Sequence, residues 1–318
     1  MKIIDQLKDT SRTLFSFELL PPMKGGNIES VYEVIDPLIR YNPINVNITY
    51  HQQEVVYKKL ENGLLQKKTI RKRPGTVAIS AAIKCKYPNL EVVPHLICGG
   101  FTKSETEYAL IDLHFLGIKN LLVLRGDPPK TQRFFRPDPD GHPFAIDLVK
   151  QIIDLNNGKY QDEDLRNTTA TDFSVGVAGY PEKHFEAANM DVDMQYLKQK
   201  VDAGADYIVT QMFFDNKKFF HFVDKCREAG ITVPIIPGLK PITRLNDMRS
   251  LPLVFHIDIP EELAAELRKC KNDKQAFDLG VEWTVNQSLE LKKYGVPALH
   301  YFTIGISDNI RQIADRVF

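Results

Sequence analysis

The stretch 102–127, TKSETEYALIDLHFLGIKNLLVLRGD, contains the structural unit that decides the fold of this chain. Thr102 and Glu105 have the spacing of a helix capping box, and Gly117 stands where helices commonly end in a left-handed residue. The apolar run 120–125 follows and leads into the polar sequence Arg-Gly-Asp. This stretch therefore predicts one helix followed by one short buried strand.

Apolar runs of this kind recur along the whole chain, with helical patterns between them. They are short, rich in β-branched and aromatic residues, and mostly not alternating between polar and apolar positions. That pattern is typical of parallel strands that are buried on both faces. We assign eight such runs, at residues 14–19, 45–50, 92–98, 120–125, 173–179, 207–213, 233–239 and 298–304.

Helix boundaries between the runs agree with this interpretation. Asp215 and Ser307 are each placed to cap a helix, and glycines stand at the expected helix ends 204, 230 and 295. Eight strand–helix units without a break in composition predict a single (β/α)8 TIM barrel over residues 1–318. An open doubly wound sheet is the alternative, but it usually carries GxGxxG, and neither that motif nor GxxxxGK[ST] occurs.

Four segments interrupt the regular pattern. Residues 53–75, 128–143 and 156–172 have the composition of loop insertions, and residues 258–294 indicate extra helix. The first insertion carries a basic cluster that could grip phosphates, although a solvated face is its more common role. The cluster consists of Lys67, Lys68, Arg71, Lys72 and Arg73.

The composition is that of an ordinary globular protein, with 43% hydrophobic residues and 41 basic side chains balancing 41 acidic ones. A neutral chain has no broad basic field, so no nucleic-acid partner is expected. The four cysteines lack metal-binding spacing and are expected to be reduced thiols in a cytoplasmic protein. We expect neither a signal peptide nor a membrane span. A homo-oligomer remains compatible with these features.

Active sites of (β/α)8 barrels lie at the carboxyl ends of the strands. The polar residues at those ends are Glu18, Thr49, Tyr50, His95, Arg125, Asp127, Tyr180, Glu182, His184 and Gln211. Glu18 interrupts an apolar run, and such surroundings raise the pKa of a carboxyl group, which suits a general acid. A buried Glu paired with Arg or Lys inside the barrel explains its position equally well.

Arg125, Gly126 and Asp127 at the fourth strand end form a second candidate feature. Gly allows close approach of the backbone to a ligand, and Arg suits phosphate or an anionic ring system. The alternative is a type I turn with an internal ion pair. His95 alone is typical of a hydrogen-bonded core histidine. Neither metal-ligand spacing nor a Schiff-base lysine is apparent, so these residues indicate an enzyme for a small polar or aromatic ligand.

At these same positions the sequence closely resembles the methylenetetrahydrofolate reductase family. Eight motifs carry the resemblance, in order and mostly near strand ends. They are SFELLPP (16–22), NITY (47–50), VPHLIC (93–98), LRGD (124–127), AGYPEKH (178–184), LKQKVDAGA (197–205), TQMFFD (210–215) and IPG (236–238).

The resemblance implies a (β/α)8 flavoprotein in which NADH or NADPH reduces non-covalently bound FAD. The reduced flavin then passes a hydride to 5,10-methylenetetrahydrofolate, giving 5-methyltetrahydrofolate for methionine synthesis. The nicotinamide leaves before the folate binds. The missing GxGxxG motif is then expected, since such barrels hold FAD without a Rossmann turn.

The resemblance also implies residue roles. Glu18 matches the general acid that protonates N10 of the folate, Asp127 the carboxylate that favours the resulting cation, and Gln211 a pterin contact. FAD contacts are implied for Thr49, Tyr50, His95, Arg125, Gly126, Asp127, Ala145, Tyr180, His184, Ala187, Asp193, Tyr196 and Lys200.

The sequence departs from the family pattern at three places. Ile306 stands where the family has a folate-contacting Arg, Leu251 where some bacterial members have a stacking aromatic, and Lys240 replaces an apolar residue. No regulatory domain that responds to S-adenosylmethionine is expected after Phe318. The change at Ile306 keeps a second hypothesis open: a catalytically impaired folate- or flavin-binding barrel subunit.

Overall fold

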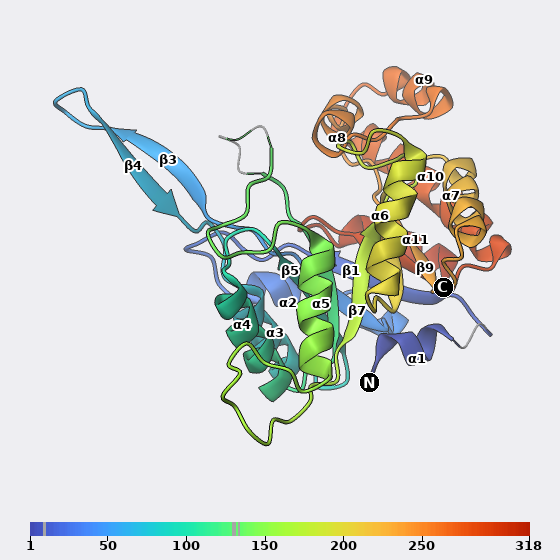
Figure 1. Ribbon diagram of the computed structural model, residues 1–318. Coiled ribbons are helices and arrows are strands. Elements are labelled where there is room, and N and C mark those ends of the chain that lie inside the picture. The colour runs from blue at the N-terminus through green and yellow to red at the C-terminus, as the bar shows by residue number, and fades with distance from the viewer. Residues whose placement is uncertain (9–10, 129–131, 133) are drawn as a thin grey trace.

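The computed structural model describes residues 1–318 except 9–10, 129–131 and 133. In the described part of the chain, eight parallel strands close into a barrel in the order β1-β10-β9-β8-β7-β6-β5-β2. Each coincides with one predicted run to within two residues at either end, so the predicted TIM barrel is confirmed (Figure 1). The strands are β1 Leu14–Leu19, β2 Asn45–Ile48, β5 Glu91–Ile97, β6 Asn120–Leu124, β7 Ser174–Gly179, β8 Tyr207–Met212, β9 Ile235–Leu239 and β10 Ala298–Phe302.

Helices cover the outside of the barrel between the strands (Figure 1). Those that follow strands are α2 Glu29–Ile35, α3 Thr76–Lys86, α4 Lys103–Phe115, α5 Ala145–Asn156, α6 Met190–Asp202, α7 Asn216–Glu228, α10 Asp273–Tyr294 and α11 Asp308–Val317. Additional short helices are α1 Ile3–Leu7, η1 Ile39–Tyr41, α8 Asp247–Phe255 and α9 Glu261–Lys269. The extra helix predicted within 258–294 is thus present as α9 and α10.

The predicted caps are largely confirmed. Thr102 and Glu105 form the capping box of α4, and Asp215 accepts a hydrogen bond of 2.9 Å from the amide of Lys217 in α7. The prediction for Ser307 is wrong. Its backbone is already right-handed helical, and its side chain makes no capping hydrogen bond, because a capping hydroxyl needs an extended residue to reach the first-turn amides.

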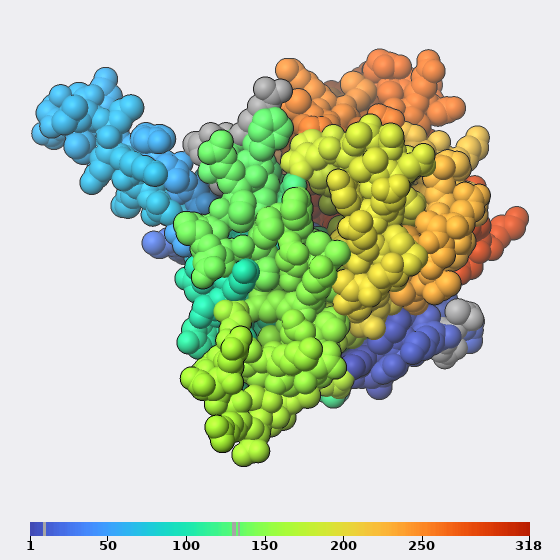
Figure 2. Space-filling model, viewed as in Figure 1, coloured from blue at the N-terminus to red at the C-terminus, as the bar shows by residue number. Residues whose placement is uncertain are grey.

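The predicted insertion 53–75 forms an antiparallel hairpin of β3 Glu54–Lys59 and β4 Leu65–Ile70. The hairpin projects from the body of the molecule (Figures 1 and 2). The insertion 156–172 starts at the last residue of α5 and is otherwise irregular. The insertion 128–143 includes residues 129–131 and 133, which lie outside the described residues.

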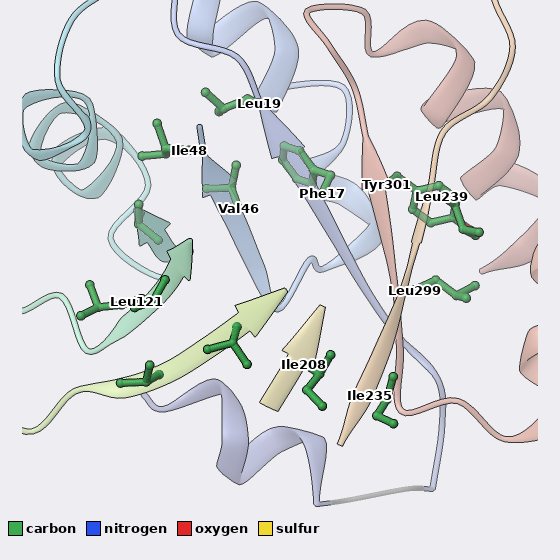
Figure 3. Close-up of a cluster of buried hydrophobic side chains, with 14 of the residues drawn as sticks. Phe17, Leu19, Val46, Ile48, Leu121, Ile208, Ile235, Leu239, Leu299 and Tyr301 are labelled. Atoms are coloured by element: carbon green, nitrogen blue, oxygen red, sulfur yellow. The ribbon is translucent and has the colours of Figure 1, made fainter. Parts of the chain in front are cut away.

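Two hydrophobic clusters hold the barrel together. The larger one joins outward-facing strand residues such as Phe17, Val46 and Ile208 to the surrounding helices (Figure 3). The smaller one fills the barrel interior and includes Ile3 and Leu7 of α1. The amide of Ile3 donates to Asn120 Oδ1 at the start of β6, so α1 closes the amino-terminal end of the barrel. The opposite end is left for the site.

Candidate active site

Two adjoining cavities lie at the carboxyl ends of the strands. The central cavity, about 370 Å³, is lined by Glu18, Thr49, Tyr50, His95, Arg125, Gly126, Asp127, Tyr180, His184 and Gln211, among others. The side cavity, about 490 Å³, is lined by Arg125, Ala145, Tyr180, His184, Ala187, Asp193, Tyr196 and Lys200, among others. Every residue for which the resemblance implies a role in catalysis, FAD binding or pterin contact therefore lines one of them. Arg125, Tyr180 and His184 line both, which makes the two cavities one continuous site.

Glu18 lies near the end of β1, largely buried in the central cavity. Burial raises its pKa to about 8. Its nearest basic neighbour is His95, whose Nε2 is 3.3 Å from Glu18 Oε2. Burial lowers the pKa of His95 to about 3, so this ring is neutral. The alternative in which Glu18 pairs with Arg or Lys is wrong for the described residues, since none forms such an ion pair with it.

A chain of amides sets the tautomer of His95. Asn45 Nδ2 donates to Asn47 Oδ1 at 2.6 Å, which directs Asn47 Nδ2 to His95 Nε2 at 3.3 Å. Because an amide nitrogen only donates, Nε2 accepts and carries its lone pair. That lone pair faces Glu18, where it repels a carboxylate and favours a carboxylic acid. The arrangement keeps a transferable proton on Glu18.

The sequence analysis missed Asn45 and Asn47. Both are buried in β2, two residues apart, on the face that also presents Thr49. Polar residues at alternate positions of an otherwise apolar, buried strand were the sequence signal that could have revealed this pair of amides. The strand-end rule overlooked them because they lie deeper in the barrel.

The Arg125–Asp127 segment leaves β6 with Gly126 at φ 86°, in the left-handed region. A Cβ there would lie 3.1 Å from the Ile97 side chain, so both conformation and space require glycine. The type I turn alternative is wrong, because that turn needs negative φ values. Arg125 pairs with Glu186 from the loop after β7, and this pairing lowers the pKa of Glu186.

A second group of polar residues shapes the side cavity. Lys200 Nζ donates to the Ala178 carbonyl at 2.8 Å, and burial lowers the pKa of this lysine to about 8. Asp193 Oδ2 accepts from the His184 amide at 2.8 Å. Burial lowers the pKa of His184 to about 4, and its ring meets Tyr180 edge to face. These contacts fix the loop after β7 beside the cavity.

Some expected residues lie elsewhere. Glu182 accepts hydrogen bonds from Lys218 Nζ and the Asp258 amide instead of lining either cavity. Leu251 packs in a hydrophobic cluster under α8, and Lys240 donates to the Pro241 carbonyl. Ile306 is outside both linings.

Phe255, Phe302 and Ile304 are among the apolar residues of the central cavity to which the sequence analysis assigned no site role. Phe255 is one turn beyond Leu251 on α8. The resemblance pointed to Leu251 for a stacking aromatic, and the structure provides one a turn later. Helical spacing of i to i+4 was the sign that could have found it.

No group of three or more His, Cys, Asp or Glu side chains in the described ranges is arranged to hold a metal ion. None of the helices of the described chain combines the length and apolar character needed to cross a membrane.

Comparisons with known proteins identify relatives over nearly the whole chain. The model of the methylenetetrahydrofolate reductase family matches residues 3–317. Methylenetetrahydrofolate reductase (NADH) 1 of Arabidopsis thaliana is 32% identical over 96% of this chain and 49% of its own length. The 5,10-methylenetetrahydrofolate reductase of Salmonella typhimurium is 29% identical over 91% of this chain and 85% of its own. The chain spans about half the length of the plant and fungal relatives that it matches.

A solved structure shows the same fold at low sequence identity. An uncharacterized Clostridium thermocellum protein that binds two copies of 5-methyl-5,6,7,8-tetrahydrofolic acid superposes with a TM-score of 0.61 at 14% identity. The match covers 99% of this chain and 97% of that one. That likeness concerns the fold, and the family match over residues 3–317 shows that the chain belongs to the methylenetetrahydrofolate reductase family.

Proposed function

We propose that residues 1–318 form a catalytic domain that reduces 5,10-methylenetetrahydrofolate to 5-methyltetrahydrofolate with NADH or NADPH. The reaction would take place in the cytoplasm and supply methyl groups for methionine synthesis. Family membership supports the reaction class. The observation that carries the assignment to this chain is Glu18, a largely buried carboxyl group that faces the neutral His95.

We further propose non-covalent FAD as the cofactor, which when bound supplies the hydride carrier between nicotinamide and folate. The residues present fit such a group. The two adjoining cavities form an elongated site, as a ring system joined to a dinucleotide requires. Arg125 at their boundary and Lys200 in the side cavity provide cations for a diphosphate. The thirteen contacts implied for FAD line these cavities.

Glu18 is proposed to donate its proton to N10 of the folate, which opens the five-membered ring to a 5-iminium cation. With a pKa of about 8 the group is protonated at neutral pH, as an acid catalyst must be. The Nε2 lone pair of His95 supports that state before the substrate binds.

Asp127 and Gln211 are proposed to orient the pterin. Both line the central cavity together with Glu18. Gln211 Oε1 accepts from the Met212 amide at 2.9 Å, which leaves its amide nitrogen free to donate to a ligand. The Asp127 carboxylate would favour the cation electrostatically once Glu18 has given up its proton.

The purified protein tests the proposal directly. We expect a yellow protein that releases FAD on denaturation, is bleached anaerobically by NADH or NADPH, and regains its colour with methylenetetrahydrofolate. A colourless protein that binds folate and rejects added FAD would instead establish the impaired binding subunit. Bleaching without recovery by the folate would leave the flavin assignment standing and overturn the substrate.

A further inference from the structure

The β3–β4 hairpin is an arm without evident support from its own chain. Figure 2 shows it standing clear of the body of the molecule. Tyr57, Leu64 and Leu65 are 57%, 64% and 65% exposed. A lone two-stranded hairpin is at best marginally stable in water, and exposed apolar side chains on it are typical of a contact surface.

One face of the hairpin combines apolar and basic side chains. Tyr57 is paired with Lys67, and Lys59 with Leu65, in the antiparallel register. Paired residues point to the same face, and residues two apart on one strand do so too, so these four side chains share one face. Neither lysine forms an ion pair with any described residue. We call these four residues the hairpin face.

A groove of complementary character runs between α3 and α4. Its volume is about 680 Å³, and small side chains form much of its lining: Ala78, Ala81 and Ala109. Phe115, 85% exposed, and Asp112 stand at its edge. Small residues leave room for larger side chains from another surface.

The exposed stripe of α4 beside this groove mirrors the hairpin face. Glu105, Tyr108, Asp112 and Phe115 follow one another at spacings of three and four residues, and all four are exposed. Residues at these spacings share one side of a helix. The stripe therefore alternates acidic and aromatic side chains, where the hairpin face has basic and apolar ones. Asp112 forms no ion pair with the described residues.

We propose that the hairpin face of one copy of this chain docks on the α3–α4 groove of a second copy, forming a two-fold dimer. Charge complementarity between the hairpin face and the α4 stripe selects a second copy as the occupant. A two-fold axis uses both surfaces of both copies, because each chain offers one hairpin and one groove. This assembly would bury the exposed aromatic and aliphatic side chains and give the hairpin its missing support.

The groove proposed to receive the hairpin also adjoins the central cavity. Tyr50 lines the groove and the central cavity alike, and Arg71 donates to its hydroxyl. The docked hairpin would therefore rest against the outer side of a wall that the ligand touches from within. The proposed dimer does not depend on the proposed reaction, because neither the hairpin face nor the α4 stripe lines either cavity.

Reversal of single charges tests the dimer by sedimentation over a range of concentrations. Lys67→Glu and Asp112→Lys should each weaken self-association roughly tenfold or more, since each homodimer would contain two repulsive contacts. An equimolar mixture of the two variants should associate again. In the mixed dimer, Glu at 67 meets Lys at 112 in one contact, and the original pair meets in the other.

Matched controls lie on α10, far along the chain from the hairpin and α4. Lys274 and Asp278 are exposed, and Lys274→Glu and Asp278→Lys should leave association unchanged. Circular dichroism checks that all variants fold. A wild-type chain that stays monomeric, or a dimer that both reversals leave intact, would overturn the proposal. Loss of association in each variant without recovery on mixing would also overturn it, since the two surfaces would then not meet.

Discussion

His95 presents the lone pair of Nε2 to Glu18 across 3.3 Å, because Asn47 donates to that same nitrogen. Burial and this lone pair act in the same direction on the Glu18 carboxyl group. Both disfavour the carboxylate, and a pKa of about 8 follows from burial. The relationship ties the protonation of Glu18 to an amide that sits deeper in the barrel.

The pH dependence of the folate half-reaction should follow from that pKa. Its rate is expected to be constant near neutral pH and to fall as pH rises through about 8, because Glu18 then loses its proton. In Glu18→Gln this limb should be absent from the residual rate. Stopped-flow recovery of flavin absorbance over pH 6–10 measures it. An unchanged limb in the Gln variant would assign it to another group.

Replacing Asn47 by Val should move this limb to lower pH. Without the amide donor, His95 can carry its proton on Nε2 and donate to the Glu18 carboxylate. A hydrogen bond to a charged group contributes ~1.5–3 kcal/mol, which corresponds to roughly one to two pKa units. The infrared carbonyl band of protonated Glu18, identified by its loss in Glu18→Gln, reports this shift independently of turnover. A band that titrates at the wild-type pH in Asn47→Val would refute the tautomer argument.

FAD retention should depend on Arg125 and Lys200. Each provides a cation to an anionic ligand, and such charge-assisted bonds contribute ~1.5–3 kcal/mol, so Arg125→Gln or Lys200→Met should weaken FAD binding roughly ten- to a hundredfold. Lys198→Met is the matched control on α6, since Lys198 pairs with Asp202 and lines neither cavity. Titration of the apo-proteins with FAD measures these affinities. Equal affinity in all three variants would show that the diphosphate lies elsewhere.

Phe255 should contribute to folate binding. Its ring lines the central cavity, and an aromatic contact is worth ~0.5–1.5 kcal/mol beyond buried area, so Phe255→Ala should raise the KM for folate about threefold to tenfold. In Phe255→Ala, NADH-driven bleaching should stay unchanged, which would separate a loss of folate binding from damage to the flavin site. Ile306→Arg, outside both cavity linings, serves as the comparison. A KM that responds to Ile306→Arg and ignores Phe255→Ala would favour the position that the resemblance indicated.

How far the sequence predicted the molecule depends on the range of the interactions concerned. The strands were predicted because residues such as Val46 and Val177 lie in buried runs whose pattern is local. Caps at Thr102 and Asp215 are equally local, whereas Ser307 failed because its neighbours had already placed it in helical conformation. The strand-end rule found Glu18 and Arg125 because barrel geometry brings such ends together, whereas Lys200 lies on helix α6 and was indicated only by the family resemblance.

Contacts between residues far apart in the sequence could not be predicted from local patterns or from the strand-end rule. Nothing local pairs Arg125 with Glu186, which lies 61 residues away, or Asn47 with His95, which is 48 residues away on a neighbouring strand. The hairpin also escaped prediction, since strongly basic strands such as residues 65–70 lack the apolar alternation that identifies a half-buried strand. Its exposed strands explain that failure: they have no core to face in their own chain.

The two half-reactions should separate in Glu18→Gln. Bleaching by NADH needs no acid at folate N10, whereas ring opening of the substrate does. Gln keeps the size and hydrogen bonding of the side chain and removes the transferable proton. General acid catalysis contributes roughly 10²–10⁴-fold, so flavin recovery with methylenetetrahydrofolate should slow by that order while bleaching changes little.

The burial of Glu18 leads to a second expectation for the same variant, which concerns the pH dependence of stability. The native pKa of about 8 exceeds the ordinary value of 4.5, so the folded protein binds the proton more tightly than the unfolded chain. Wild-type stability should therefore lose a contribution as pH rises from about 5 to 8, and the Gln variant should not show this loss. Stopped-flow absorbance measures the two rates, and thermal unfolding against pH measures the stability. Equal slowing of both half-reactions would show that Glu18 supports the barrel or the flavin instead of acting as the acid.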